Sequence, residues 1–369
     1  MGRRCKNAAQ HQRGLTRLHT PMDSISQAAL GSAVVLATLG RRTAAWKAAL
    51  WGAFAGTLPD LDAFIDHGDP LLNMVRHRAE SHGLVLLGLF SAPLGWLAAR
   101  LAGQPDLWRR WWLATALALL THPLLDTFTV YGTQLLQPFS NHPFAIGSMF
   151  IIDPLYTLPL LLGVAAALCM RENHGLHWNG VALAFSTLYL GWSLLAQLHV
   201  RSVVEASLHE QGIAAQQVLV TPAPFSTVLW RAVAMGPEKY HEAYYSLLDG
   251  GHPVQWIAHP RGTDVLEQHS GNPHVQRLGW FSHGFMRVGM NSSGHLTITD
   301  LRMGLEPCYT FHFDLGQAQP NTGITTSPTQ LWQRPDLSLS LGWWWQRLAD
   351  PAAGHLSALP GIQGCAAQP

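Results

Sequence analysis

Apolar runs that approach the length of a membrane span dominate the first two hundred residues of this chain. A transmembrane helix needs roughly 20 mostly apolar residues, and six stretches come near that length. They are residues 25–39, 44–58, 83–101, 111–125, 150–170 and 178–198. Because a lipid-embedded segment must satisfy its own backbone polar groups, we expect all six to be helical. The first two are short for full spans and could form a tilted or re-entrant pair.

The composition separates the chain into two environments. Its 369 residues favour two domains, and only 12% of them are charged, about half the share expected of a soluble globular chain. The apolar runs end near residue 198, and the sequence after residue 199 is typical of soluble proteins. We therefore predict a polytopic all-α membrane domain of about five or six transmembrane helices over residues 22–199, followed by a small soluble α+β domain over residues 200–316.

The predicted soluble domain contains short runs of β-branched and aromatic residues that are broken by Gly, Pro and Asn. This pattern is typical of strands in an antiparallel sheet. The predicted strands are residues 217–221, 227–235, 254–258, 285–290, 295–301 and 309–313, and residues 264–278 favour a helix. Residues 317–369 are expected to form a linker and a final helix at 337–348, which its three tryptophans could place either at the membrane surface or against the sheet.

Basic residues in the short loops indicate an orientation for the membrane domain. One side holds seven Lys and Arg residues (Arg41, Arg42, Lys47, Arg100, Arg109, Arg110, Arg171) and the other holds three (Arg76, Arg78, Arg201). The positive-inside rule then places the first side in the cytoplasm and the C-terminal domain outside it. Residues 1–21 lack the apolar segment of a secretory signal, so we expect a disordered extension, with Met22 as an alternative start. Counting the five basic residues of this extension reverses the balance.

The net charge and the cysteines exclude two kinds of site. A formal net charge of +1 provides no basic footprint, so we predict no nucleic-acid partner. The four cysteines are far apart and show no zinc-ribbon spacing. Cys308 and Cys365 could form a disulfide if the C-terminal domain lies in an oxidising compartment.

Ionisable side chains gather where the apolar runs begin or end. Asp60 and Asp62 follow the second run, and His77, Arg78 and His82 precede the third. The fourth run ends at His122 and Asp126, and the fifth begins at Asp153. If all six runs cross the membrane, these four clusters lie on the same side of it.

The clustered side chains are those that bind divalent metals. Imidazole and carboxylate groups are the usual ligands of catalytic zinc, and carboxylate-rich sites also suit manganese. On a helix, His122 and Asp126 project from one face, and the turn that contains Asp60 and Asp62 can aim both carboxylates at one point. The candidate ligands are Asp60, Asp62, His77, His82, His122, Asp126 and Asp153. They exceed the three protein ligands of a mononuclear catalytic zinc, so we predict a zinc or manganese site with either two ions or one ion and supporting residues.

Each candidate also has a purely structural interpretation. Asp153 precedes Pro154 and suits a helix N-cap, while Asp60 and Asp62 suit a turn after Pro59. His77 and His82 could be interfacial, and His122 and Asp126 could pair only with each other. Ionisable residues at the edge of an apolar run are retained mainly for function or pairing, so the four clusters taken together favour a shared site.

Several motifs in the same order resemble those of a known family. They are the opening Met22 to Gly31, the turn Leu58 to Asp62, His77-Arg78 with Ser81-His82, His122 to Asp126 with Tyr131-Gly132-Thr133, and Ile152 to Tyr156. Over residues 22–198 they resemble the YdjM-like family of bacterial inner-membrane proteins, which are described as metal-dependent hydrolases. The resemblance implies an inner-membrane location and a metal site.

These observations predict a membrane-bound metal-dependent hydrolase in which a metal-activated water attacks a phosphoester or lipid-linked substrate at the bilayer surface. Asp62 or Asp126 would act as general base, and Arg78 would bind an anionic group of the substrate. One alternative is a transporter or ion-binding protein whose polar clusters line a pathway. A second is a non-catalytic anchor or scaffold for the C-terminal domain.

Overall fold

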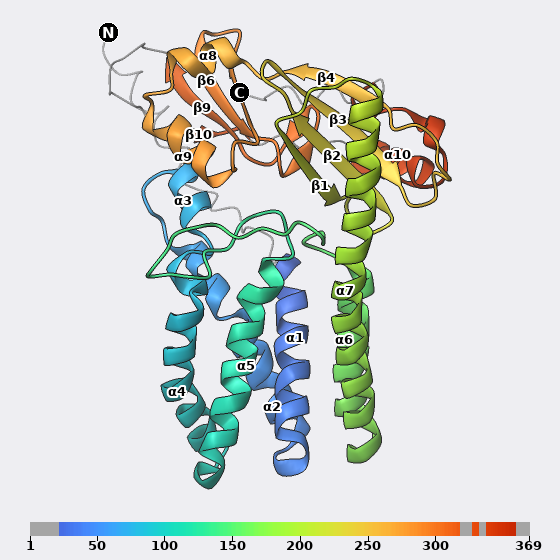
Figure 1. The fold of residues 1–369 in the computed structure, drawn as a ribbon. Helices are drawn as coiled ribbons and strands as arrows, with labels where there is room; N and C mark the ends of the chain where they lie inside the picture. The colour runs from blue at the N-terminus through green and yellow to red at the C-terminus, as the bar shows by residue number, and fades with distance from the viewer. Residues whose placement is uncertain (1–21, 318–326, 332–336, 359–369) are drawn as a thin grey trace, which may run out of the picture.

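A computed structural model describes residues 22–317, 327–331 and 337–358 of the chain. Its N-terminal half is helical, as predicted, and each of the six apolar runs coincides with a helix. These helices are α1 (Met22–Leu39), α2 (Ala45–Thr57), α4 (Leu84–Leu101), α5 (Trp108–Asp126), α6 (Pro154–Cys169) and α7 (Glu172–Glu210). Figure 1 shows them running roughly side by side, with α6 paired to the lower part of the long α7. The predicted disorder of residues 1–21 lies outside the described residues.

Within the described part of the chain, two helices are long and apolar enough to cross a membrane. They are Leu84–Leu101 in α4 and Asn173–Glu210 in α7, while α6 is apolar but shorter. The prediction of about five or six spans is thus supported by length and hydropathy for two helices only. The shortfall has a physical cause, because α2 has 13 residues and α5 carries Arg109, Arg110, His122 and Asp126 along its 19.

Small residues allow α1 and α2 to approach closely. A Cβ atom on Gly31 would lie 2.2 Å from the carbonyl oxygen of Gly52, and one on Gly56 would lie 2.5 Å from the carbonyl oxygen of Gln27. Any side chain at these positions would therefore force the two backbones apart. Glycines at the interface of membrane helices commonly permit such close packing.

The C-terminal half contains two four-stranded antiparallel sheets and two short helices, which confirms the predicted α+β class. The first sheet has the order β1 (Gln217–Pro222), β2 (Leu229–Met235), β3 (Lys239–Ser246), β4 (Trp256–Pro260). The second has the order β10 (Thr329–Gln330), β9 (His312–Gln317), β6 (His295–Asp300), β5 (Met286–Met290). A small hairpin joins β7 (Gly304–Leu305) to β8 (Cys308–Tyr309), and the predicted helix is split into α8 (Thr263–Gln268) and α9 (Pro273–Phe281).

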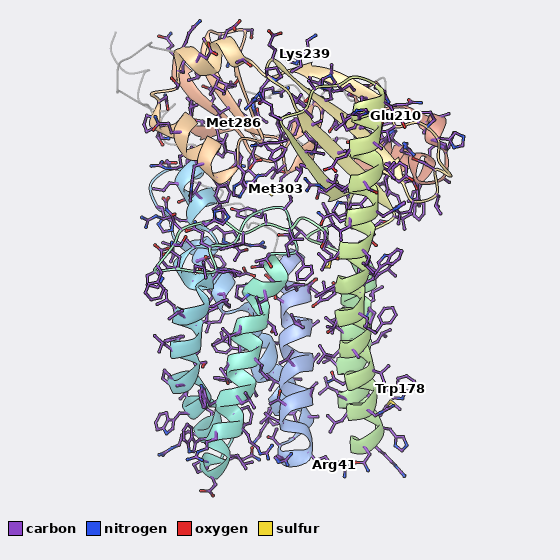
Figure 2. The ribbon with its side chains drawn as sticks, in the orientation of Figure 1. Arg41, Trp178, Glu210, Lys239, Met286 and Met303 are labelled. Carbon is purple, nitrogen blue, oxygen red and sulfur yellow. The ribbon has the colours of Figure 1, made fainter. Side chains whose placement is uncertain are left out.

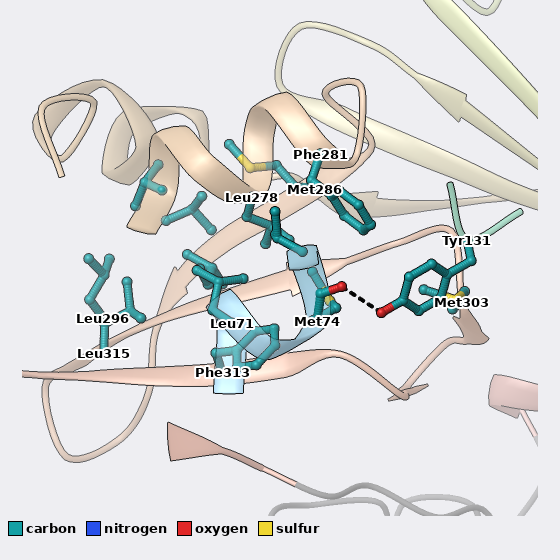
Figure 3. Close-up of a cluster of buried hydrophobic side chains, with 14 residues drawn as sticks. Leu71, Met74, Tyr131, Leu278, Phe281, Met286, Leu296, Met303, Phe313 and Leu315 are labelled. Atoms are coloured by element: carbon teal, nitrogen blue, oxygen red, sulfur yellow. Dashed lines mark hydrogen bonds between the residues drawn. The ribbon is translucent and has the colours of Figure 1, made fainter. Parts of the chain in front are cut away.

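Two helices of the N-terminal half connect the bundle to these sheets. The upper part of α7 packs its Val200, Val204 and Leu208 against the first sheet, so the predicted domain boundary at residue 199 falls within a continuous helix. Figure 2 shows the length of this helix, with Trp178 near one end of the molecule and Glu210 among the strands. The short helix α3 (Pro70–Arg76) inserts into the core of the second sheet (Figure 3).

The C-terminal helix α10 (Leu337–Ala349) packs on the protein rather than lying free on a surface. Trp343 is buried against Tyr244 of β3, with ring centroids 4.8 Å apart, and Arg347 forms an ion pair with Asp249 at 2.8 Å. Of the two interpretations left open for this helix, the structure supports packing against the sheet. Cys308 is disulfide-bonded, but Cys365 lies outside the described residues, so their pairing stays a prediction.

Candidate metal centre

Four ionisable side chains from three separate segments meet at the end of the helical bundle that faces the sheets. Asp60 lies in the 3-10 turn Pro59–Phe64, which follows α2, and His82 lies in the turn Glu80–His82, which precedes α4. His122 and Asp126 occupy the last turn of α5. One ligand atom from each residue lies within 4.8 Å of the other three. Among the described residues, no other group of His, Cys, Asp and Glu meets this condition.

Five of the six separations among the four ligand atoms lie between 3.1 and 3.5 Å. The Nε2 atoms of His82 and His122 are 3.1 Å apart. Asp60 Oδ1 lies 3.5 Å from Nε2 of His82 and 3.3 Å from Nε2 of His122. Asp126 Oδ2 lies 3.2 Å and 3.4 Å from the same two nitrogens. A tetrahedral metal site with bonds of about 2.0 to 2.1 Å has ligand atoms about 3.3 to 3.4 Å apart, so these separations fit a single ion.

A buried oxygen without a hydrogen-bond partner supports the same interpretation. Asp126 is 1% exposed, and its Oδ2 atom has no hydrogen-bond partner among the residues that the structure describes. Leaving a carboxylate oxygen buried and unsatisfied is costly unless a cation or ion pair compensates it. The oxygen that faces the two imidazole rings is therefore well suited to bind a metal.

Both histidines are held by their second ring nitrogen. His122 Nδ1 lies 2.6 Å from the carbonyl oxygen of Gly56, which can only accept a hydrogen bond, so Nδ1 carries the proton. His82 Nδ1 lies 2.8 Å from Ser81 Oγ. In each ring Nε2 is directed at the ligand group. Metal-binding histidines characteristically use the other nitrogen in this way.

Asp126 Oδ1 is held by two residues that do not join the ligand group. Gln27 of α1 donates a hydrogen bond to this oxygen through Nε2 at 2.8 Å, and its side chain is almost fully buried. Arg78 Nη2 lies 3.4 Å from the same oxygen. The Arg78 guanidinium also donates to Thr129 Oγ1 at 3.1 Å. Arg78 thus brings a buried positive charge beside the carboxylates.

The predicted ligands Asp62 and His77 lie one layer outside the ligand group. Asp62 Oδ1 is 2.7 Å from His77 Nδ1, and Asp62 Oδ2 accepts hydrogen bonds from the Ser81 hydroxyl and from the Arg78 backbone N–H. The same Oδ2 atom lies 3.5 Å from His82 Nδ1. Asp62 therefore orients His82 through the nitrogen that is turned away from the ligand atoms.

The pKa values of the turn residues reflect this network. Burial raises the pKa of Asp62, but the opposing hydrogen bonds to His77 and His82 are stronger and hold it well below its ordinary value. Burial lowers the pKa of His82, but its contacts with Asp126, Asp60 and Asp62 outweigh burial and raise the pKa to about 9. A metal ion would therefore take the place of a proton at His82.

Asp153 is not brought to the ligand group. It forms the N-cap of α6, where Oδ1 accepts a hydrogen bond from the Leu155 N–H at 2.9 Å and Pro154 occupies the first helical position. Its Oδ2 accepts a hydrogen bond from the Tyr189 hydroxyl at 2.8 Å. The capping interpretation accounts for Oδ1, and the contact with Tyr189 accounts for Oδ2.

Tyr131 links the outer layer of the site to the C-terminal half. Its ring lies edge-on to His77 at 5.6 Å between centroids and under the Arg78 guanidinium at 5.1 Å. Its hydroxyl donates a hydrogen bond to the Met74 carbonyl at 2.6 Å (Figure 3). The ring also lies edge-on to Phe281, with 5.7 Å between centroids. Arg78 has a φ of 66°, an uncommon conformation for a non-glycine residue that is often found at functional sites.

Three residues of the site were not predicted from the sequence. Gln27 and Ser81 were recognised only as parts of family-like motifs, and nothing indicated that they contact Asp126 or orient His82. Tyr131 was likewise noted only within its motif. The available signal for Gln27 was an amide side chain in an apolar helix, because such a residue needs a hydrogen-bond partner.

Comparisons with known proteins identify a family for the N-terminal half of the chain. The chain is 23% identical over 229 residues to a protein of Bacillus subtilis (strain 168) described as uncharacterized protein YfhP. The match covers 62% of this chain and 63% of that relative, so the chain spans less than two thirds of the relative's length. No solved structure matches the chain significantly. The family model for YdjM inner membrane proteins matches residues 22–200, the segment that carries all four ligand residues, and this segment therefore belongs to the YdjM inner membrane protein family.

Proposed function

We propose that this protein is a membrane-bound metal-dependent hydrolase whose metal is held by Asp60, His82, His122 and Asp126. The observation that carries the proposal is the spacing of the four ligand atoms, in which five of the six separations fall between 3.1 and 3.5 Å. Zinc and manganese both accept this set of imidazole and carboxylate ligands. A divalent metal bound here would activate a water molecule and polarise the bond to be hydrolysed.

The residues around the ligands have distinct proposed roles. Asp126 belongs to the ligand group, which leaves Asp62 as the candidate for the general base among the two carboxylates predicted for that role. Arg78 neutralises part of the carboxylate charge and would attract an anionic group of the substrate. This arrangement suits a phosphoester, whose charge develops on oxygens near a metal and a guanidinium.

The proposed setting is the bacterial inner membrane, in line with the family name. We propose that the six helices α1, α2, α4, α5, α6 and α7 form the membrane domain and that α4 and α7 span it fully. We further propose that the site and the C-terminal domain lie outside the cytoplasm. The support for the orientation is the larger number of basic residues in the loops at the opposite end of the bundle.

Metal content measured by mass spectrometry tests the site directly. Detergent-purified wild type should contain about one equivalent of zinc or manganese, and the His122→Ala/Asp126→Ala double variant should contain none while keeping its helical circular dichroism. A His199→Ala variant, which alters an exposed histidine of α7, should bind metal like the wild type. Equal metal content in the double variant would remove the proposal. If the wild type binds metal and the double variant does not, the metal-loaded protein would be screened for hydrolysis of phosphoester and lipid substrates.

The number of ligands favours one alternative function. Four protein ligands complete a tetrahedral zinc site, and closed sites of this kind are usually structural, whereas catalytic sites keep a position for water. A structural ion would tie α5 to the turns beside α2 and α4 and make the membrane part an anchor for the C-terminal domain. If the ion is structural, removing it should lower the melting temperature of the protein, and any hydrolysis that the protein catalyses should not depend on the metal. The transporter alternative has less support, since the ligand group lies at the end of the bundle.

A further inference from the structure

We propose that an exposed apolar rim beside the ligand group inserts into the headgroup layer of the membrane and admits an amphiphilic substrate from the bilayer. The rim consists of Leu61, Phe64 and Ile65 in one segment and Leu136 and Phe139 in another. The insertion rests on the exposure of the rim and on the membrane span proposed for α4, while the identity of the admitted molecule as a lipid to be hydrolysed rests on the proposed hydrolase activity.

The rim side chains are large, apolar and unusually accessible. Phe64 is 80% exposed and Phe139 is 81% exposed. Leu61, Ile65 and Leu136 are 52%, 56% and 47% exposed. Large apolar side chains that gather beside a site commonly mark contact with a membrane or another apolar partner.

Both rim segments adjoin a ligand residue. Leu61 directly follows Asp60, and Phe64 ends the same 3-10 turn. The second segment is fixed to the start of α4, where the Leu84 N–H donates a hydrogen bond to the Leu135 carbonyl at 2.9 Å. A Cβ atom on Gly83 would lie 2.8 Å from the Gln137 carbonyl oxygen, so this contact is close. His82 immediately precedes that contact point.

The depth of the rim follows from α4. This helix is one of the two that are long and apolar enough to span a membrane, and it exposes Val85, Leu89 and Phe90 along its surface. Its 18 residues correspond to about 27 Å, close to the roughly 30 Å hydrocarbon thickness of a bilayer. With α4 in the hydrocarbon, its first residue, Leu84, lies at the headgroup boundary. The rim segment that is bonded to Leu84 lies at the same depth. A lipid surface therefore covers the rim as a continuation of the surface that covers α4.

The most accessible residue of the ligand group, Asp60, lies in the rim segment that contains Leu61 and Phe64. The side chain of Asp60 is 14% exposed, whereas those of His82, His122 and Asp126 are 0 to 1% exposed. Approach to the ligand atoms from solvent or lipid thus leads past Asp60, in the turn that carries Leu61 and Phe64. A molecule with an apolar tail and a polar, phosphate-bearing head could leave its tail among the rim residues and place its head at Asp60.

Site-specific labelling tests the insertion without a known activity. Phe64→Cys and Phe139→Cys would be labelled with an environment-sensitive fluorophore, in a background without free native cysteines, and reconstituted in vesicles of phosphatidylethanolamine and phosphatidylglycerol. Lys239→Cys is the control, because Lys239 is exposed and lies in the C-terminal domain, at the end of the molecule opposite to Arg41 (Figure 2). Lipids brominated near the headgroup should quench the labels at 64 and 139 at least twofold and leave the label at 239 unchanged. Labels at 64 and 139 that respond like the label at 239 would overturn the insertion.

A second measurement separates this inference from the proposed function. In the Phe64→Glu/Phe139→Glu variant, metal content should stay at the wild-type level, because both side chains are about 80% exposed and neither belongs to the ligand group. Hydrolysis of a vesicle-embedded phospholipid should fall at least tenfold, and hydrolysis of water-soluble bis(p-nitrophenyl) phosphate should change less than twofold. Equal loss on both substrates would overturn the admission of substrate from the bilayer. A third outcome is that the labels are quenched but the wild type hydrolyses neither substrate. That outcome would refute the proposed hydrolase activity and the proposed lipid substrate, but it would leave the insertion of the rim supported.

Discussion

His122 Nδ1 lies 2.6 Å from the carbonyl oxygen of Gly56, which belongs to a different helix. This contact fixes the tautomer of His122 and so leaves Nε2 free to bind a metal. It depends on the close packing of α1 on α2, because a Cβ atom on Gly56 would lie 2.5 Å from the Gln27 carbonyl oxygen. Gln27 in turn holds Asp126. The small residues of these two helices thus set the position of two ligands.

We expect Gly56→Ala to weaken metal binding although the residue is not a ligand. The new methyl group would push α1 from α2 and displace both the carbonyl bonded to His122 and the glutamine bonded to Asp126. Loss of such supporting contacts typically costs about 10- to 100-fold in metal affinity. Competition with a chromophoric chelator measures the affinity. Gly88→Ala is the matched control, since no atom of the described part of the chain lies within 4 Å of a Cβ atom there. Equal affinities for the two variants would contradict this account.

Asp60→Asn and Asp62→Asn should differ in their effect on metal binding. Asp60 contributes a ligand oxygen, so its amide variant should lose bound metal during purification. Asp62 orients His82 and His77 from outside the ligand group, so its variant should still bind one equivalent at saturating metal, with an affinity about 10- to 100-fold lower. Metal titrations monitored by the visible spectrum of cobalt(II) compare the two directly. If Asp62→Asn has no site at saturating cobalt, Asp62 is a ligand as the sequence suggested.

Tyr131→Phe should affect both stability and the metal site. The substitution leaves the buried Met74 carbonyl without its partner, which costs about 1 to 3 kcal/mol in the free energy of unfolding. It also loosens α3, the helix that leads directly into His77 and Arg78. Tyr240→Phe is the control, because its hydroxyl makes an equally short bond of 2.6 Å to Glu306 within the C-terminal domain. Urea unfolding should show comparable losses for both variants, whereas chelator competition should show weaker metal binding for Tyr131→Phe alone.

Part of the site could be predicted from spacing, and part depended on the tertiary fold. The four-residue spacing of His122 and Asp126 placed both on one helical face, and the structure brings them into one ligand group with Asp60 and His82. Spacing could not show that Asp62 lies outside that group, because adjacent turn residues aim their carboxylates according to the contacts each one makes. Among the strands, β3 was missed because its inward face carries Glu242, paired with Arg231, which breaks the apolar pattern of a buried strand.

Acid should destabilise the C-terminal domain through His312. Burial, reinforced by the nearby Arg287 charge, lowers the pKa of His312 to about 4 in the folded protein, against 6.5 for an unperturbed histidine. Between these values the unfolded chain binds a proton that the folded protein does not, so the free energy of unfolding falls as the pH falls from 6.5 towards 4. The loss attributable to His312 is about 2 kcal/mol at pH 5 relative to pH 7. Urea unfolding at several pH values should show a smaller loss for His312→Gln than for the wild type. An exposed control, His209→Gln, should keep the wild-type slope, and an unchanged slope in His312→Gln would place the sensitivity elsewhere.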